Sequence, residues 1–299
     1  MVLVGSTGTV LDGIGNTPLV ELDGLWVKLE FLNPSGSVKA RIARYMVEQA
    51  EESGLIRPGD TIVEASSGNT GNALSMVAAV KGYRMVVVMP RGLSSERVAI
   101  SRAFGAELEL TGNFHVNEAQ ARAAELAEQD GWWGPRQFDS EWNVEENRLW
   151  LGREILEGLP HPPDALVMGI GTGGTLIGVG QAMRAVNAET VLVGVEPDES
   201  CTFLCGEIGR HAIEGIADGF VPGIMARHGS MVDEFVPVES EAALDAMHYL
   251  ARRHGMFVGP SSGANYAAAQ DLRRQRPSLE TVVTLFCDEG EKYISEHFS

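Results

Sequence analysis

Residues 61–81 read TIVEASSGNTGNALSMVAAVK and are the most informative segment for the fold. It begins with a short buried-strand pattern from Thr61 to Glu64, continues through a turn of small residues, and ends in a helical pattern from Gly71 to Lys81. A strand, a glycine-containing turn and a helix in this order are typical of a parallel sheet with crossover helices. The stretch therefore predicts an α/β fold.

The same alternation of strand and helix extends along the chain. Two segments interrupt it: residues 132–150 read as irregular and aromatic-rich, where the chain could leave one domain, and residues 198–237 read as a poorly periodic loop region. The other predicted strands are 25–31, 84–89, 107–111, 165–168, 191–195 and 281–287, and the other predicted helices are 40–52, 94–104, 117–129, 174–186, 241–254 and 263–275.

Composition excludes several classes of protein. The chain has 299 residues, of which 44% are hydrophobic and 21% charged, enough for one large or two ordinary globular domains. Its net charge of -18, with no basic run, disfavours nucleic acid and anionic membrane surfaces as partners. The N-terminus lacks a basic region followed by an apolar core, and no apolar run approaches ~18 residues. We expect a cytoplasmic protein.

The three cysteines predict no metal site. The chain has an odd number of cysteines, so they cannot all pair in disulfides, and no two of them form a CxxC motif. They are Cys201, Cys205 and Cys287. A metal shared by Cys201 and Cys205 would need two more ligands, and only His211 is near in sequence. We expect buried or idle thiols.

Lys39 is the lysine that least resembles an ordinary surface residue. Only four of the 23 basic residues are lysines, and Lys39 stands in NPSGSVKAR (residues 33–41), between a strand-like and a helix-like run. A lysine on a turn of small residues can have its amine aimed into a cleft and desolvated, the state in which it forms Schiff bases. Lys28, Lys81 and Lys292 are expected to be solvated ammonium groups.

The first glycine-rich loop follows the strand at 61–64. Its small residues let backbone amides approach an anion at a helix N-terminus. The hydroxyls of Ser66, Ser67 and Thr70 and the amide of Asn69 add donors beyond what a plain turn needs. A purely structural turn is the alternative.

The second loop, GIGTGGT at residues 169–175, allows two interpretations. It satisfies GxGxxG, and Glu196 stands where a ribose-binding carboxylate would follow, which favours an NAD-dependent oxidoreductase. Thr172 and Thr175 among four glycines equally suit a single terminal phosphate. The motif alone does not distinguish a dinucleotide site from a site for a single phosphate.

The third loop, GPSSG at residues 259–263, matches GxSxG, and Asp288 and His297 follow in the hydrolase order. Alternatively, Ser261 could bond a heterocyclic nitrogen. A cofactor with an aldehyde, a phosphate and a ring nitrogen would use Lys39, the second loop and Ser261 together, and would leave the first loop for a substrate carboxylate. That cofactor is pyridoxal phosphate.

With these motifs in order, the chain resembles the cysteine synthase and cystathionine β-synthase family, which has the tryptophan synthase β-like fold. The resemblance runs from IGNTPLV (residues 14–20) to DEGEKY (residues 288–293). It implies two domains, each a mostly parallel twisted sheet with helices on both faces. The larger, pyridoxal-phosphate-binding domain would comprise residues 1–38 plus 146–299, and the smaller, mobile domain with the substrate-carboxylate loop would comprise residues 39–145.

The resemblance also implies a role for each candidate residue. Lys39 would be catalytic and hold the cofactor as an internal aldimine, Asn69 would bond the ring hydroxyl, and Ser261 would meet the pyridine nitrogen. Gly215 would border the active site, and no metal is expected. The phosphate would be bound by Gly171, Thr172, Gly173, Gly174 and Thr175, and the substrate carboxylate by Ser66, Ser67, Asn69, Thr70 and Gln137.

The implied reaction is a β-replacement that forms L-cysteine from O-acetylserine or O-phosphoserine and sulfide through an α-aminoacrylate. Cystathionine, cyanoalanine or diaminopropionate synthesis and cysteine desulfhydration are the alternatives within the family. Phosphoserine-using relatives carry an arginine after GFVP, and Arg227 lies close to that segment here. Family members commonly have Gln where Glu214 stands. A homodimer is expected from the resemblance.

Overall fold

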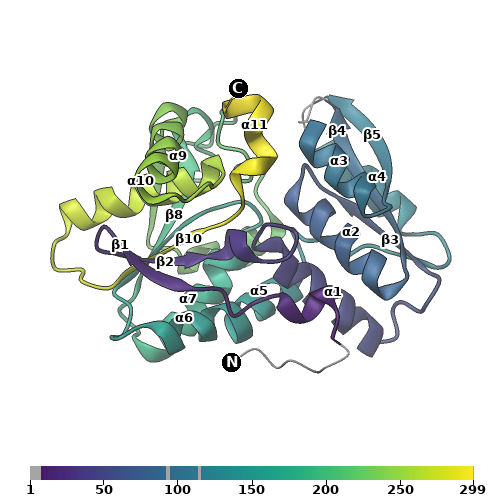
Figure 1. Ribbon diagram of the computed structural model, residues 1–299, viewed down its shortest axis with the longest axis horizontal. Coiled ribbons are helices and arrows are strands. Elements are labelled where there is room, and N and C mark those ends of the chain that lie inside the picture. Colours follow the sequence, from purple (N-terminus) through teal and green to yellow (C-terminus); the bar gives the residue numbers. More distant parts are fainter. Residues whose placement is uncertain (1–7, 92–94, 114–115, 299) are drawn as a thin grey trace.

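The computed structural model describes residues 8–91, 95–113 and 116–298, and it contains two sheets lying side by side (Figure 1). In the larger sheet, all neighbouring strands are parallel except the first pair, β1 and β2. The strand order is β1 (Leu19–Leu22), β2 (Leu25–Leu29), β10 (Val282–Phe286), β7 (Ala165–Gly169), β8 (Val191–Pro197) and β9 (Glu234–Val238).

The smaller sheet is entirely parallel. Its order is β5 (Glu107–Asn113), β4 (Arg84–Arg91), β3 (Thr61–Ala65) and β6 (Trp132–Trp133). Successive residues of β3 point to opposite faces: Ile62 packs in the core beneath helices α1 (Lys39–Glu52) and α2 (Asn69–Lys81), and Val63 packs beneath α4 (Val116–Leu126). Helices therefore cover both faces, which is why the strand is continuously apolar.

The larger sheet is also covered on both faces. Leu166 and Leu192 pack with α6 (Gly152–Gly158) and α7 (Gly174–Val186), whereas Val167 and Val193 pack with α9 (Ser240–His254) and α10 (Pro260–Gln275). Two short helices that are far apart in the sequence, α3 (Ser95–Ala103) and α11 (Ile294–His297), meet where the Ser295 backbone N–H donates to Glu96 at 3.0 Å.

Two segments that were expected to be irregular contain short regular elements, so those predictions are wrong in part, although residues 201–222 are irregular as expected. Residues 132–150 include β6, helix α5 (Glu141–Glu146) and the start of a π-helix over Asn147–Leu151. Residues 198–237 include helix α8 (Gly223–His228) and most of β9. These elements are too short for periodicity to reveal, and packing against α7 and pairing with β8 hold them in place. The predicted start of α3 at residue 94 lies outside the described residues.

Cys201 and Cys205 form a disulfide, so the expectation of two idle thiols is wrong for this pair. A turn brings their Cα atoms to 5.2 Å, within the range that a disulfide can bridge. Cys287 is a buried free thiol, as expected. Among the described residues, no helix is long and apolar enough to cross a membrane.

Candidate active site

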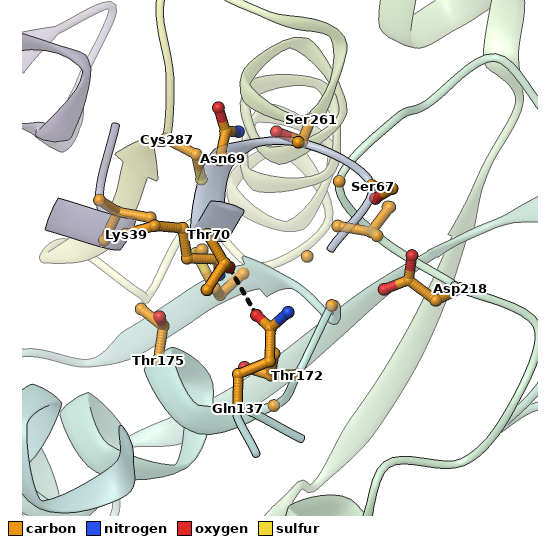
Figure 2. Close-up of a pocket in the computed structure, with 18 of the residues that line it drawn as sticks. Lys39, Ser67, Asn69, Thr70, Gln137, Thr172, Thr175, Asp218, Ser261 and Cys287 are labelled. Atoms are coloured by element: carbon orange, nitrogen blue, oxygen red, sulfur yellow. Dashed lines mark hydrogen bonds between the residues drawn. The ribbon is translucent and has the colours of Figure 1, made fainter. Parts of the chain in front are cut away.

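One pocket gathers the three glycine-rich loops and Lys39 (Figure 2). The loops end strands β3 and β7 and begin helix α10, so residues far apart in sequence meet at one place. Gly174 is the one predicted site residue that does not line the pocket. The predicted residues that line it are Lys39, Ser66, Ser67, Asn69, Thr70, Gln137, Gly171, Thr172, Gly173, Thr175, Gly215 and Ser261.

Lys39 is the first residue of α1, and its side chain enters the pocket. Desolvation lowers the pKa of its amine, although the charges of Cys287, Asp218 and Asp288 oppose the shift. A lowered pKa increases the fraction of uncharged amine, which is the form that attacks carbonyl carbon and accepts protons.

The first loop is held in shape by its own side chains. Ser66 Oγ accepts hydrogen bonds from the backbone N–H of Gly68 at 3.1 Å and of Gly71 at 2.9 Å. Thr70 Oγ1 donates to Gln137 Oε1 at 2.5 Å, and Gln137 Nε2 donates to the Ala65 carbonyl at 3.0 Å. The loop is thus fixed at the N-terminus of α2, where amides and the helix dipole favour an anion.

Asn69 is oriented by a buried lysine. Lys292 Nζ donates to Asn69 Oδ1 at 2.9 Å and to the carbonyls of Ser35 at 2.7 Å and Gly36 at 3.0 Å. Asn69 Nδ2 in turn donates to Asp288 Oδ2 at 2.6 Å. The prediction of a solvated Lys292 is therefore wrong: it is fully buried and connects the turn before Lys39 to the first loop.

Lys28 is also buried, which contradicts the same prediction. Its Nζ lies 2.6 Å from the Thr17 carbonyl and 2.9 Å from Glu154 Oε2. Lys81 is partly exposed and pairs with Glu51 at 2.7 Å. Apolar neighbours in the sequence of Lys28 could have indicated burial, because its strand is covered on both faces.

The second loop forms a tight cradle before α7. A Cβ on Gly171 would lie 2.6 Å from the backbone oxygen of Gly215, and Gly173 has φ +85°, where side chains are strained. Thr172 Oγ1 accepts from Asn143 Nδ2 at 3.0 Å and from the Gly174 amide at 3.3 Å. Gly174 provides space for Asn143 instead of lining the pocket.

Glu196 is not available as a ribose-binding carboxylate. It is 1% exposed, and its two oxygens accept hydrogen bonds from the backbone N–H groups of Phe203 and Leu204, both at 2.8 Å. The observation that favoured a dinucleotide is therefore explained by a turn after β8.

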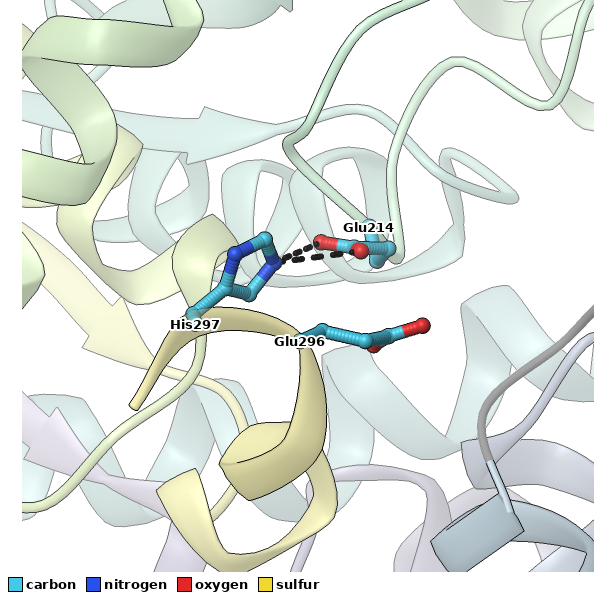
Figure 3. Close-up of side chains that lie close together, drawn as sticks. All are labelled: Glu214, Glu296 and His297. Atoms are coloured by element: carbon cyan, nitrogen blue, oxygen red, sulfur yellow. Dashed lines mark hydrogen bonds and ion pairs between the residues drawn. The ribbon is translucent and has the colours of Figure 1, made fainter. Parts of the chain in front are cut away.

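The hydrolase triad does not assemble. His297 Nε2 lies 3.1 Å from Glu214 Oε2, in a group that also contains Glu296 (Figure 3). Arg97 lies 3.6 Å from Glu296, so each of the two carboxylates of this group already has a side-chain partner. Asp288 accepts from Tyr293 and Asn69, not from a histidine beside Ser261.

Asp218 is a pocket residue that sequence reasoning missed. Among the described residues, Asp218 and Lys39 are the two charged residues that line the pocket. Its sequence signal was a carboxylate inside the glycine-rich segment IEGIADGF (residues 213–220). Arg227, in contrast, does not line the pocket and pairs with Glu141 at 2.8 Å.

Comparison with known proteins gives consistent matches over nearly the whole chain. A family model described as "Pyridoxal-phosphate dependent enzyme" matches residues 10–288. The cysteine synthase of Staphylococcus aureus is 40% identical over 292 residues, which cover 94% of each chain. The O-ureido-L-serine synthase of Streptomyces lavendulae is 41% identical over 296 residues, covering 96% of this chain and 91% of that protein.

A solved structure gives the same result for the fold. The O-acetylserine-dependent cystathionine β-synthase from Helicobacter pylori superposes with a TM-score of 0.93 at 32% identity, covering 99% of this chain and 100% of that one. The expected architecture of two mostly parallel sheets with helices on both faces is confirmed.

Proposed function

The chain belongs to the pyridoxal-phosphate-dependent enzyme family and is a cysteine-synthase-like member with the tryptophan synthase β-like fold, and from this premise we propose that it forms L-cysteine from an activated serine and sulfide. The observation that carries the proposal is a desolvated lysine amine, Lys39, in one pocket with two loops built for anions. One loop suits the cofactor phosphate and the other an amino-acid carboxylate.

The residues present fit the cofactor. Gly171 and Gly173 leave a cradle that a Cβ would fill, at the N-terminus of α7, and this cradle suits the phosphate. We propose that Thr172 and Thr175 complete it, whereas the Gly174 amide is bonded to Thr172 Oγ1. The Lys39 amine would hold the aldehyde, because it is the lysine that lines this pocket.

The remaining site residues take roles around the ring and the substrate. We propose that Ser261 meets the ring nitrogen and that Asn69, oriented by Lys292, bonds the ring hydroxyl. The substrate carboxylate would be bound by the first loop. The residues proposed for that task are Ser66, Ser67, Asn69, Thr70 and Gln137, with Gly215 at the border of the pocket.

Bound in this pocket, pyridoxal phosphate supplies an electron sink for the electron pair left when the substrate Cα loses its proton. The chain itself positions the substrate and moves the proton. The first loop fixes the carboxylate, so that the Cα–H bond faces Lys39. The uncharged Lys39 amine then accepts the Cα proton as general base and returns it to the product.

The charges in the pocket favour O-acetylserine over O-phosphoserine as the donor. A phosphate leaving group requires a cationic partner, yet Arg227 lies outside the pocket and pairs with Glu141. A neutral acetyl ester needs no such partner.

Formation of O-ureido-L-serine is the second candidate, because the S. lavendulae relative that bears this name is as similar as the S. aureus cysteine synthase, at 41% and 40% identity. Cystathionine, cyanoalanine or diaminopropionate synthesis and cysteine desulfhydration are further candidate reactions for the same site.

Three further expectations stay predictions. They are the domain division at residues 38/39 and 145/146, a homodimer and a cytoplasmic location.

Spectral titration of the purified holoenzyme tests the reaction. O-Acetylserine, O-phosphoserine and serine are added separately, and the visible absorbance of the bound cofactor is recorded. We expect O-acetylserine to shift the spectrum at lower concentration than O-phosphoserine, and sulfide to restore it with release of cysteine. A spectrum that no donor changes would contradict the proposal, and restoration by hydroxyurea but not by sulfide would favour the second candidate.

Gly171→Ala tests the phosphate cradle. The new Cβ would press on the Gly215 carbonyl, while the Ala217 amide holds that segment to the Ile170 carbonyl at 3.0 Å. We expect the Kd for pyridoxal phosphate to rise at least about tenfold, equivalent to ~1.4 kcal/mol. The readout is fluorescence or absorbance titration of apoprotein with the cofactor.

Gly229→Ala is the matched control, since a Cβ there would make only an ordinary contact of 3.7 Å with Met225. Equal cofactor affinity in Gly171→Ala and Gly229→Ala would mean that the second loop does not bind the phosphate.

A further inference from the structure

We infer that Asp218 is the acid–base group for the substituent on the substrate Cβ: it donates a proton to the group that leaves and accepts one from the group that joins. This inference rests on the proposed function. It identifies Asp218 as a second catalytic residue and predicts that the enzyme also accepts β-substituents that must be protonated to leave, such as the hydroxyl group of serine.

The backbone around Asp218 presents its side chain to the pocket. Ala217 has φ +53° and Gly219 has φ +84°, so two left-handed residues flank the aspartate. The Ala217 amide donates to the Ile170 carbonyl at 3.0 Å, and the Phe220 ring packs on Phe138 with centroids 4.9 Å apart. A left-handed non-glycine residue held in place by its surroundings is a feature that clusters at functional sites.

Asp218 and Lys39 lie on different elements and at opposite ends of the drawn set of side chains (Figure 2). Gln137 and Thr70, which are joined by a hydrogen bond, lie between them in this view. A substrate whose carboxylate is bound by the first loop can therefore face Lys39 with one side and Asp218 with another. The two groups would serve different atoms of one substrate.

The surroundings of Asp218 favour the protonated form of its carboxyl more than solvent does. Burial raises the pKa of its carboxyl, and the charges that oppose this shift belong to Lys39 on α1, His211 in the loop before Ile213, and Arg97 on α3. Among the described residues, no hydrogen-bond donor is placed on the Asp218 carboxylate, unlike the buried carboxylate of Glu196. Its oxygens are therefore available to a ligand.

The proton balance closes without another reactant. When the Cβ–X bond breaks, its electron pair goes to X, and the Asp218 carboxyl group protonates X to give HX. The incoming Nu–H then forms the Nu–Cβ bond, and its proton goes to the Asp218 carboxylate. Lys39 removes and returns the Cα proton separately, so each group ends the cycle in its starting state.

Two donors with different leaving groups test the first half. Acetate can leave without the help of an acid at pH 7, whereas hydroxide cannot, since the pKa of water is about 15.7. In the wild type Asp218 protonates either group, so its carboxylate can then accept the proton of the incoming thiol. The holoenzyme is mixed rapidly with O-acetylserine or serine, and the absorbance change of the bound cofactor is timed. We expect Asp218→Asn to slow the change with serine by about 10²-fold or more and the change with O-acetylserine by no more than about threefold.

The pH dependence of thiol addition tests the second half. After O-acetylserine has reacted, methyl mercaptoacetate is added, and the return of the absorbance is timed between pH 6.5 and pH 9.5, a range that brackets a thiol pKa close to the ~8.5 of the cysteine side chain. In Asp218→Asn the rate should rise about tenfold per pH unit and approach the wild-type rate above the thiol pKa. A residue that only supports the fold would not produce this recovery.

Asp245→Asn is the matched control, because it makes the same change on an exposed carboxylate of α9. Asp218→Glu keeps the carboxyl and should recover part of the rate with serine, which covers the case in which Asp218→Asn folds poorly. Equal slowing of both donors in Asp218→Asn, or a wild-type enzyme that responds to O-acetylserine and not to serine, would overturn this inference alone. No response to either donor would overturn the proposed function and this inference together.

Discussion

Lys39→Ala is expected to abolish turnover, with a loss of at least about 10³-fold, and to remove the covalent link to the cofactor. Both effects follow because one amine is proposed to hold the cofactor and to move the Cα proton. Burial lowers the pKa of this amine, which increases the fraction of its uncharged, reactive form.

No other lysine can replace Lys39, because each has a partner elsewhere. Lys28 bonds Glu154, Lys81 bonds Glu51, and Lys292 bonds Asn69 and two backbone carbonyls. The amine of none of these lysines lines the pocket.

Borohydride reduction followed by mass spectrometry measures the link. The wild type should gain the mass of the reduced cofactor on the peptide that contains Lys39, and Lys39→Ala should gain none. Lys81→Ala, a change at a partly exposed lysine, should behave as the wild type does. A reduced cofactor attached to another residue of Lys39→Ala would refute the assignment.

The parts of the site that the sequence predicted are those encoded locally. Each glycine-rich loop joins a strand to a helix, or begins a helix, within about a dozen residues, so its small residues and hydroxyls reveal an anion site without knowledge of the fold. Lys39 was identifiable for the same reason, because a lysine surrounded by Pro, Ser and Gly has few structural explanations.

The parts that sequence reasoning missed depend on contacts between distant segments. Asn69 and Lys292 are 223 positions apart, yet they share a hydrogen bond of 2.9 Å. The segment of Asp218 is held by the backbone hydrogen bond from Ala217 to Ile170 on another loop. Strand β9 pairs with β8 along five residues whose own pattern is weak. No local periodicity reports such pairings, because tertiary packing determines them.

Arg41→Met is expected to lower the free energy of unfolding by about 3–5 kcal/mol, the usual cost of removing one partner from a buried ion pair. Arg41 is fully buried. It donates to Glu30 at 2.6 Å and 2.9 Å and to Glu154 at 2.8 Å and 2.6 Å. Without the guanidinium, two carboxylates would lose their main cationic partner in the interior, since Lys28 contacts only Glu154.

Denaturant unfolding at several pH values measures this effect. Hydrogen bonds and the charge of Arg41 hold the pKa of Glu154 at about 2, against the raising effect of burial. A carboxyl with a depressed folded pKa stabilises the protein above its unfolded pKa of about 4.5, and this stabilisation is lost as the pH falls toward 2. The difference between wild type and Arg41→Met should therefore be largest at neutral pH and shrink below about pH 4.5.

Glu146→Gln is the control from the same network, and its expected behaviour is the opposite. Burial raises the pKa of Glu146 to about 8, and neither of its carboxyl oxygens has a hydrogen-bond partner, with Arg41 3.9 Å away. At pH 7 this side chain is mostly protonated, so a neutral glutamine should cost little. As the pH rises from about 4.5 to about 8, the unfolded wild type releases the Glu146 proton while the folded protein still holds it. The free energy of unfolding of the wild type should therefore fall over this range, and that of Glu146→Gln should not. If Arg41→Met and Glu146→Gln reduced the unfolding free energy equally at pH 7, the loss would reflect disturbed packing at this position and not the charge balance of the network.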